Sequence, residues 1–135
     1  MKRFVQVFLF LNLLLWIGAC SFTTANFTNL AMASAIDTDN KPIQVTQEFA
    51  TNTPTIYVTG TVKNAPSNTI IKVEWIYLET DPITLITDYE ITVNDVTVNF
   101  YFELTKPSQG WPTGRYEARL YIDDVLKETL SFEVK

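Results

Sequence analysis

Hydrophobic and polar residues alternate along most of the chain after residue 28, and this period of two is typical of strands with one buried face. In 84–93, for example, the shared face is formed by Leu85, Tyr89, Ile91 and Val93. The alternating segments, each expected to be a strand, are 30–36, 55–64, 69–80, 84–93, 96–104, 116–122 and 126–134. Helical periodicity is missing from 29–135. The pattern therefore predicts an all-β domain.

Turn-forming residues separate the expected strands about every 8 to 12 residues. Asn94-Asp95 and Asp123-Asp124 are predicted to be two-residue hairpin turns, because both residue types tolerate the left-handed backbone that tight hairpins require. The Pro- and Gly-containing segment 106–114 marks a longer loop. About seven strands at this spacing favour an antiparallel β-sandwich over 29–135, with a jelly roll or a small barrel as the alternative.

Two features resemble immunoglobulin-like sandwiches. Trp75 lies in the middle of the third expected strand, where such domains commonly bury a tryptophan. The segment 114–118 (GRYEA) resembles a tyrosine corner, with Ala118 where antibody domains have a cysteine. Residues 110–123 are also similar to the closing strands of uncharacterised immunoglobulin-like domains in bacterial secreted and surface proteins. The resemblance implies a disulfide-free immunoglobulin-like β-sandwich in which Trp75 and Tyr116 are structural.

The first twenty residues follow a different pattern. Lys2 and Arg3 precede an apolar run over 4–17, which is shorter than the ~20 residues of a spanning helix. A basic start, an apolar middle and small residues at the end are typical of a secretory signal. The end of the segment, Ile17-Gly18-Ala19-Cys20, resembles the lipobox of bacterial lipoproteins.

The lipobox resemblance implies cleavage between Ala19 and Cys20, followed by a diacylglycerol thioether on the Cys20 thiol. Acyl chains at ~0.8 kcal/mol per buried CH₂, palmitate among them, would anchor the protein to a bacterial membrane. Residues 1–19 are then the signal peptide, 20–28 an acylated tether and 29–135 the sandwich. Ser21, where inner-membrane lipoproteins typically have aspartate, favours the outer membrane in a cell that has one. An ordinary cleaved signal or an uncleaved anchor helix stays open.

Composition narrows the possible partners. The 135 residues suffice for one domain, and 47% hydrophobic content supports a folded core. Loss of Lys2 and Arg3 with the signal leaves eight basic against fifteen acidic residues, so the formal net charge changes from −5 to −7. Nucleic acids and anionic headgroups need Lys and Arg contacts to phosphate. We therefore expect neither as a partner, apart from the membrane that the lipid anchor enters.

Catalytic chemistry has little support in the sequence. The chain has no histidine, and its one cysteine is assigned to acylation. The serines lack both a histidine base and a glycine-flanked elbow. Four glutamates lie on expected strands without a spacing that singles out a pair: Glu74, Glu79, Glu103 and Glu117. We expect no enzyme and no cofactor.

Two further sets of residues are candidate sites. Asp37, Asp39 and Asn40 are spaced like the start of a calcium loop, but the glycine and distal glutamate of an EF-hand are missing. Turn formation explains these residues more simply, so no metal is expected. Trp111 and Pro112 lie in the 106–114 loop. Trp111 is expected to plug the end of the core, or alternatively to anchor a partner.

The sequence therefore predicts a lipid-anchored cell-envelope protein with a non-catalytic domain that binds another envelope protein. One alternative is a protease inhibitor that inserts loop 105–114 into an active-site cleft. Another is a carbohydrate-binding module, for which Tyr57, Tyr101 and Tyr121 are the outward-facing aromatic candidates.

Overall fold

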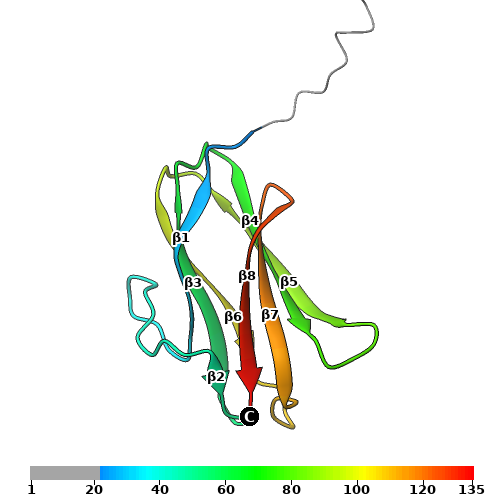
Figure 1. The fold of residues 1–135 in the computed structure, drawn as a ribbon. Helices are drawn as coiled ribbons and strands as arrows, with labels where there is room; N and C mark the ends of the chain where they lie inside the picture. Colours follow the sequence, from blue (N-terminus) through cyan, green and yellow to red (C-terminus); the bar gives the residue numbers. More distant parts are fainter. Residues whose placement is uncertain (1–21) are drawn as a thin grey trace, which may run out of the picture.

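The computed structural model describes residues 22–135, which form eight strands and no helix (Figure 1). The strands are β1 (Asn26–Ala33), β2 (Glu48–Phe49), β3 (Thr55–Lys63), β4 (Thr69–Tyr77), β5 (Thr84–Val93), β6 (Val98–Thr105), β7 (Gly114–Ile122) and β8 (Val125–Val134). The predicted signal peptide, the Ala19-Cys20 cleavage site and the acylated cysteine lie outside the described residues. Within residues 22–135 no helix has the length and hydropathy needed to cross a membrane.

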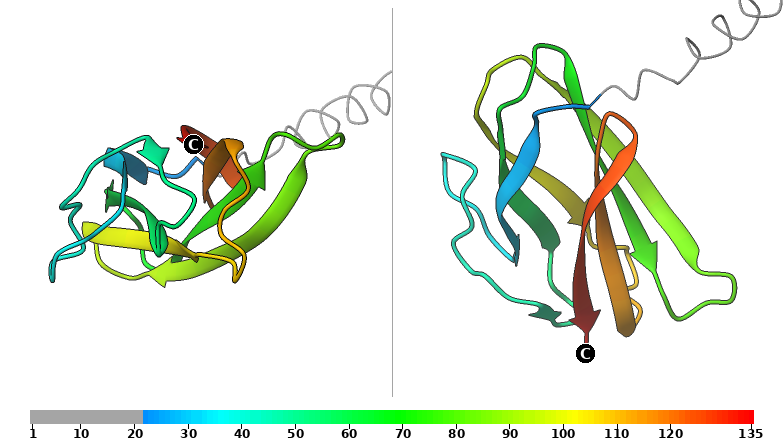
Figure 2. Two further views of the ribbon diagram at one scale, coloured as in Figure 1. Left: turned by 90° about the horizontal axis from the view of Figure 1, so that it is seen from below. Right: turned by 45° about the horizontal axis from the view of Figure 1, so that its top comes forward.

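The strands form two sheets packed face to face as a β-sandwich (Figure 2). One sheet has three strands in the order β1-β3-β6, and the other has five in the order β2-β8-β7-β4-β5. Neighbouring strands are antiparallel except for β2 and β8, which pair in parallel. The all-β prediction is confirmed. The sequence predicts about seven strands and the structure has eight; the additional strand is β2, whose two residues are too few to show a period of two.

The core lies between the sheets and consists of the alternate residues of the central strands. Members that are 0% exposed include Ile56, Val58, Val62, Ile71, Val73, Trp75, Ala118, Leu120 and Ile122. The Trp75 ring packs edge-on against Phe132 at a centroid distance of 6.0 Å. The Tyr116 ring stacks on Phe132 at 5.1 Å, and its hydroxyl donates a hydrogen bond to the Pro112 carbonyl at 2.5 Å. These contacts fix the strand faces that period-two alternation predicts.

Only one of the two predicted hairpin turns exists. Asp123 and Asp124 have φ values of 47° and 65°, and they join β7 to β8 with Ile122 opposite Val125. Asn94-Asp95 is not a hairpin turn, because β5 and β6 belong to different sheets. The Asn94 Oδ1 atom accepts a hydrogen bond from the Asn68 N–H at 3.1 Å, so this segment holds the β3–β4 turn instead. Turn propensity is local and does not say which strand will be the partner.

The first strand begins earlier than expected. Asn26 already pairs with Lys63, and the Phe27 ring contacts the Phe100 ring at a centroid distance of 5.4 Å. Ala25 is 5% exposed, so the sandwich begins near residue 25 and the expected tether over 20–28 is too long. The polar residues of NFTN resemble a linker in sequence, although edge strands tolerate polar residues on their outer face.

Candidate binding surface

β4 and β5 are neighbours in the five-stranded sheet, yet their inner faces differ in burial. Ile71 pairs with Ile91 and Val73 with Tyr89, so all four side chains point toward the same layer. Ile71 and Val73 are 0% exposed, whereas Ile91 is 39% and Tyr89 is 55% exposed. The facing sheet has fewer strands. β1, at one edge of this three-stranded sheet, contacts β8. The three strands therefore cover β8, β7 and β4, and the sheet ends before β5.

A groove of about 580 Å³ follows from this difference in strand number. From β5 it is lined by 89–91, from β6 by the continuous run 99–105, and from the β1–β2 loop by Asn40. Viewed along the sandwich, β5 and β6 lie on the same side of the two layers (Figure 2, left). The groove is therefore the open side of the sandwich.

Both strands beside the groove are sheet edges. Within residues 22–135, β5 pairs with β4 alone and β6 pairs with β3 alone. An edge strand carries a row of backbone N–H and C=O groups without a partner strand. The open side therefore offers backbone hydrogen bonding together with apolar surface.

The free edge of β6 carries one acidic side chain. Glu103 lines the groove and is exposed, and none of the lining residues in the described part of the chain is basic. Glu90 follows Tyr89 and is opposite Lys72, so its side chain faces the outer side of the five-stranded sheet and only its strand borders the groove. Glu103 is without an ion-pair partner among the described residues.

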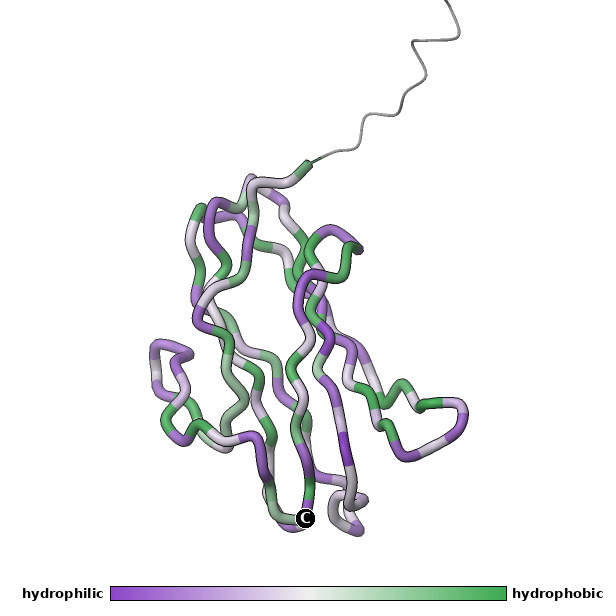
Figure 3. Tube along the Cα trace, viewed as in Figure 1, coloured by the Kyte–Doolittle hydropathy of each residue, from purple (hydrophilic) through white to green (hydrophobic). Residues whose placement is uncertain are grey.

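Other apolar side chains are exposed at the start of β5 and just before it, outside the groove. Ile83, Leu85 and Ile86 are 46%, 51% and 40% exposed, and hydrophobic residues mark this projecting segment in Figure 3. A register shift between Trp75 and Ile76 places Leu85 opposite Ile76. Because Tyr77, the next residue, packs against the core, Ile76 and Leu85 face outward. The predicted common face of Leu85 with Tyr89, Ile91 and Val93 is therefore wrong at Leu85, and the bulge is the reason.

Trp111 lies at the end of the core rather than on the surface. It is 5% exposed, and its indole N–H donates to the Thr53 carbonyl at 2.7 Å. Gly110, with φ of 83°, lets the loop approach closely, since a Cβ there would lie 2.9 Å from the Thr51 carbonyl oxygen. This burial favours the plug over the partner anchor for Trp111, while Pro112 stays exposed.

The calcium candidates form a turn. The Asp37 carboxylate accepts hydrogen bonds from the N–H groups of Asp39 at 2.8 Å and Lys41 at 2.9 Å. Asn40 adopts the left-handed conformation, with φ of 62°. The carboxylate that would bind a cation is thus occupied by backbone donors, and no group of three metal-ligating side chains occurs in residues 22–135.

The strand glutamates have separate partners rather than one another. Glu74 accepts a hydrogen bond from Tyr121, an interaction that raises the pKa of that hydroxyl. Glu117 pairs with Arg119 at 2.9 Å. Of the other two strand glutamates, Glu103 lies at the groove and Glu79 pairs with Arg115.

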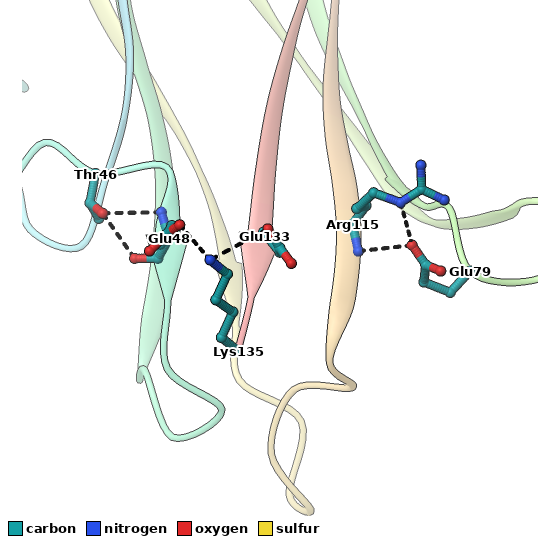
Figure 4. A network of polar contacts seen from close by, with 6 residues as sticks. All are labelled: Thr46, Glu48, Glu79, Arg115, Glu133 and Lys135. Atoms are coloured by element: carbon teal, nitrogen blue, oxygen red, sulfur yellow. Dashed lines mark hydrogen bonds and ion pairs between the residues drawn. The ribbon is translucent and has the colours of Figure 1, made fainter.

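Ion pairs tie together the end of the sandwich that carries the C-terminus (Figure 4). Lys135 lies 2.6 Å from Glu48 and 3.9 Å from Glu133, which holds β2 beside β8. Arg115 donates from Nε to Glu79 at 2.7 Å, and this hydrogen bond lowers the pKa of the glutamate. All of these side chains are solvent-exposed, and exposed pairs contribute little to stability. The Lys135 pairs position the C-terminal residue beside β2, and the Arg115–Glu79 pair joins β7 to the connection between β4 and β5.

The outward tyrosines do not form one platform. Tyr57 and Tyr101 lie on the three-stranded sheet with ring planes 62° apart. Tyr121 belongs to β7 of the other sheet. Stacking on sugar rings favours coplanar aromatic side chains, and this arrangement does not provide them.

Comparisons with known proteins inform the fold. No family model matches the chain, and no curated protein matches it. Among solved structures, the Pseudomonas fluorescens alkylpurine DNA glycosylase AlkC, bound to DNA containing an abasic site analog, is similar with a TM-score of 0.54. The match has 9% sequence identity and covers 84% of this chain and 31% of that chain. At this identity the likeness shows the fold alone, and the chain spans about a third of that structure's length.

Proposed function

We propose that this chain is a lipid-anchored cell-envelope protein whose immunoglobulin-like sandwich is a non-catalytic domain that binds another envelope protein. The observation that carries the binding role is the uncovered inner face of β5, where Tyr89 and Ile91 remain 55% and 39% exposed. Contiguous apolar surface of this kind on a folded domain commonly marks an interaction site.

The order of the strands supports the immunoglobulin-like assignment. If β1, β3, β4, β5, β6, β7 and β8 are taken as strands A, B, C, C′, E, F and G, the two sheets become ABE and GFCC′. Trp75 then lies on strand C, directly opposite Ala118 of strand F, the position of the cysteine in antibody domains. The Tyr116 hydrogen bond to Pro112 has the form of a tyrosine corner.

The location of the first described residues supports a simple anchoring geometry. Ala25 is buried in one end of the sandwich, and Thr24 donates to the Asn64 carbonyl at 2.7 Å. If Cys20 is acylated, residues 21–25 span at most ~18 Å to the membrane. That end, opposite the C-terminus in Figure 1, would face the lipid, and the groove would run along the side of the domain.

The anchor is tested by replacing Cys20 with serine in the full chain. We expect the wild type to be labelled by radioactive palmitate and to fractionate with membranes, and Cys20→Ser to lose both properties. Ser21→Ala, which changes the neighbouring residue without removing the thiol, is the matched control and should behave as wild type. Palmitate labelling that persists in Cys20→Ser would contradict the anchor.

The binding role is tested by photo-cross-linking in intact cells. A photoreactive amino acid at Tyr89 is compared with one at Thr129, an exposed residue of β8 outside the groove. We expect a discrete cross-linked protein from position 89 and none from position 129. If neither position, nor a survey of the other exposed loops, yields a discrete product, the binding role is wrong.

A further inference from the structure

We propose that the groove between β5 and β6 binds an extended segment of the partner, which adds as a strand to the free edge of β6, with apolar side chains in the groove and a basic side chain beside Glu103. This inference rests on the proposed binding role and specifies its site and chemistry.

The free edge of β6, rather than that of β5, is the one that buries the exposed surface. A strand on the outer edge of β5 would extend the five-stranded sheet and leave Tyr89 and Ile91 uncovered. A strand added to β6 would become the fourth strand of the smaller sheet and would lie over those two residues. The groove is lined by 99–105, nearly the whole of β6 and only 89–91 of β5, as this mode of binding requires.

An added strand presents its side chains to two different surroundings. Successive residues of a strand point to opposite faces, so alternate side chains of the segment would enter the groove toward Tyr89 and Ile91. These positions favour apolar residues. The intervening side chains would lie beside the outward face of β6, next to Glu103. The position beside Glu103 favours lysine or arginine, since that carboxylate has no ion-pair partner in the described residues.

A second copy of this chain is a poorer occupant. β5 contains Asp88 and Glu90, β6 contains Glu103, and neither strand contains a basic residue. Either of these strands from a second copy, added to β6, would bring no lysine or arginine to Glu103, and pairing β6 with a second β6 centred on residue 103 would place Glu103 opposite itself, which destabilises a strand pair. Charge complementarity therefore favours a different chain with basic residues.

Synthetic peptides test this inference on the full chain purified in detergent. The first probe is a capped peptide of about ten residues in which lysine alternates with valine or threonine. A second peptide has glutamate at every lysine position. A third retains the lysines but has proline at two positions, which removes backbone donors and so blocks ladder formation. Affinities are measured by fluorescence anisotropy, and hydrogen exchange is followed by mass spectrometry.

We expect the lysine peptide to bind at least about tenfold more tightly than the glutamate peptide at low ionic strength, and this difference to shrink with added salt. The proline peptide should lose most of the affinity. Exchange should slow within Val98–Thr105 and remain unchanged within Asn26–Ala33, the other edge of the same sheet.

A charge reversal makes the expectation specific to the groove. Glu103→Lys should reverse the preference, so that the glutamate peptide binds more tightly. Glu128→Lys makes the same change in net charge at an exposed residue outside the groove, and it should leave the preference unchanged. Thermal unfolding of both variants confirms that each is folded.

Three results would overturn the inference: equal binding of the lysine and glutamate peptides, slowed exchange in Thr84–Val93 instead of β6, or slowed exchange in β6 that depends on protein concentration alone. The last would identify a second copy as the occupant. If the peptides fail while position 89 still cross-links a partner in cells, strand addition is wrong and the binding role stands.

Discussion

The central strand β4 and the edge strand β5 show how differently one alternating pattern can be used. They pair residue by residue, with Ile71 opposite Ile91 and Val73 opposite Tyr89. On β4 these inner residues are fully buried, whereas on β5 a large part of each is exposed to solvent. The difference does not lie in the strands themselves. It comes from the other sheet, which ends at β6 and leaves β5 without a covering layer.

An apolar face and a buried face are therefore separate properties of a strand. Edge strands are commonly protected by charges, by bulges or by short length. β5 has Asp88, Glu90 and a bulge near Leu85, yet it is ten residues long and retains apolar residues on its inner face. That combination limits nonspecific pairing and keeps an apolar surface available, which is what a selective binding edge requires.

The largest expected effect is a difference in stability between alanine variants of Ile71 and Ile91, which are opposite each other on β4 and β5. Ile71→Ala should lower the free energy of unfolding by ~3 kcal/mol, because it removes buried methylene groups and leaves a cavity. Ile91→Ala should cost ~1 kcal/mol or less, since a large part of that side chain is already in water. Denaturant unfolding measures both values, provided that the m-values match. Equal losses would mean that the open side is covered in solution.

A smaller loss of stability is expected at Tyr116, whose side chain is buried between the sheets. Tyr116→Phe removes the hydrogen bond to the Pro112 carbonyl and keeps the ring that stacks on Phe132. The expected loss is ~1 kcal/mol with an unchanged fold, as judged by chemical denaturation and circular dichroism. Tyr101→Phe, at an exposed tyrosine beside the groove, is the control and should cost nothing measurable.

Ionisation of Tyr116 is expected to make the stability of the domain depend on pH in the alkaline range. Burial raises the pKa of Tyr116 from 10.0 to about 12, and the neighbouring Tyr77 adds to the shift. The unfolded chain ionises this phenol near pH 10, whereas the folded chain must keep it neutral. Its contribution is therefore complete below pH 10 and is lost as the pH rises toward 12. Tyr116→Phe should have a flatter stability profile in that range, and parallel profiles would contradict the assignment.

The sequence predicts strands and faces well where one rule operates. The core residues of 55–62 and 116–122 follow from alternation alone, and Asp123-Asp124 follows from turn chemistry. It fails where tertiary pairing decides the outcome. Asn94-Asp95 has hairpin residues but connects two sheets, and the polar residues 26–28 form a strand because β3 lies beside them.

The sequence does not predict the groove either, because tertiary pairing decides whether a strand is covered. Alternation placed Tyr89 and Ile91 on an apolar face, but nothing local says that the opposite sheet would have fewer strands. One signal was present in the sequence: the outward positions of 84–93 and 98–105 have acidic residues and no basic ones. The fate of Trp111 likewise depended on Thr51 and Thr53, which are about 60 residues away in the chain.

The smallest expected change in stability is at Tyr89, and it tests the open side most directly. Tyr89→Thr retains a β-branched residue with good strand propensity, so the free energy of unfolding should change by ~0.5 kcal/mol or less. Peptide binding at the groove should nevertheless fall, because the ring supplies apolar surface to the occupant. Tyr57→Thr, on the outward face of the other sheet, should leave peptide binding unchanged. A loss of ~2 kcal/mol or more at Tyr89 would show that the domain itself buries this ring. The difference between β4 and β5 would then disappear, and with it the argument that the open side is kept for a partner.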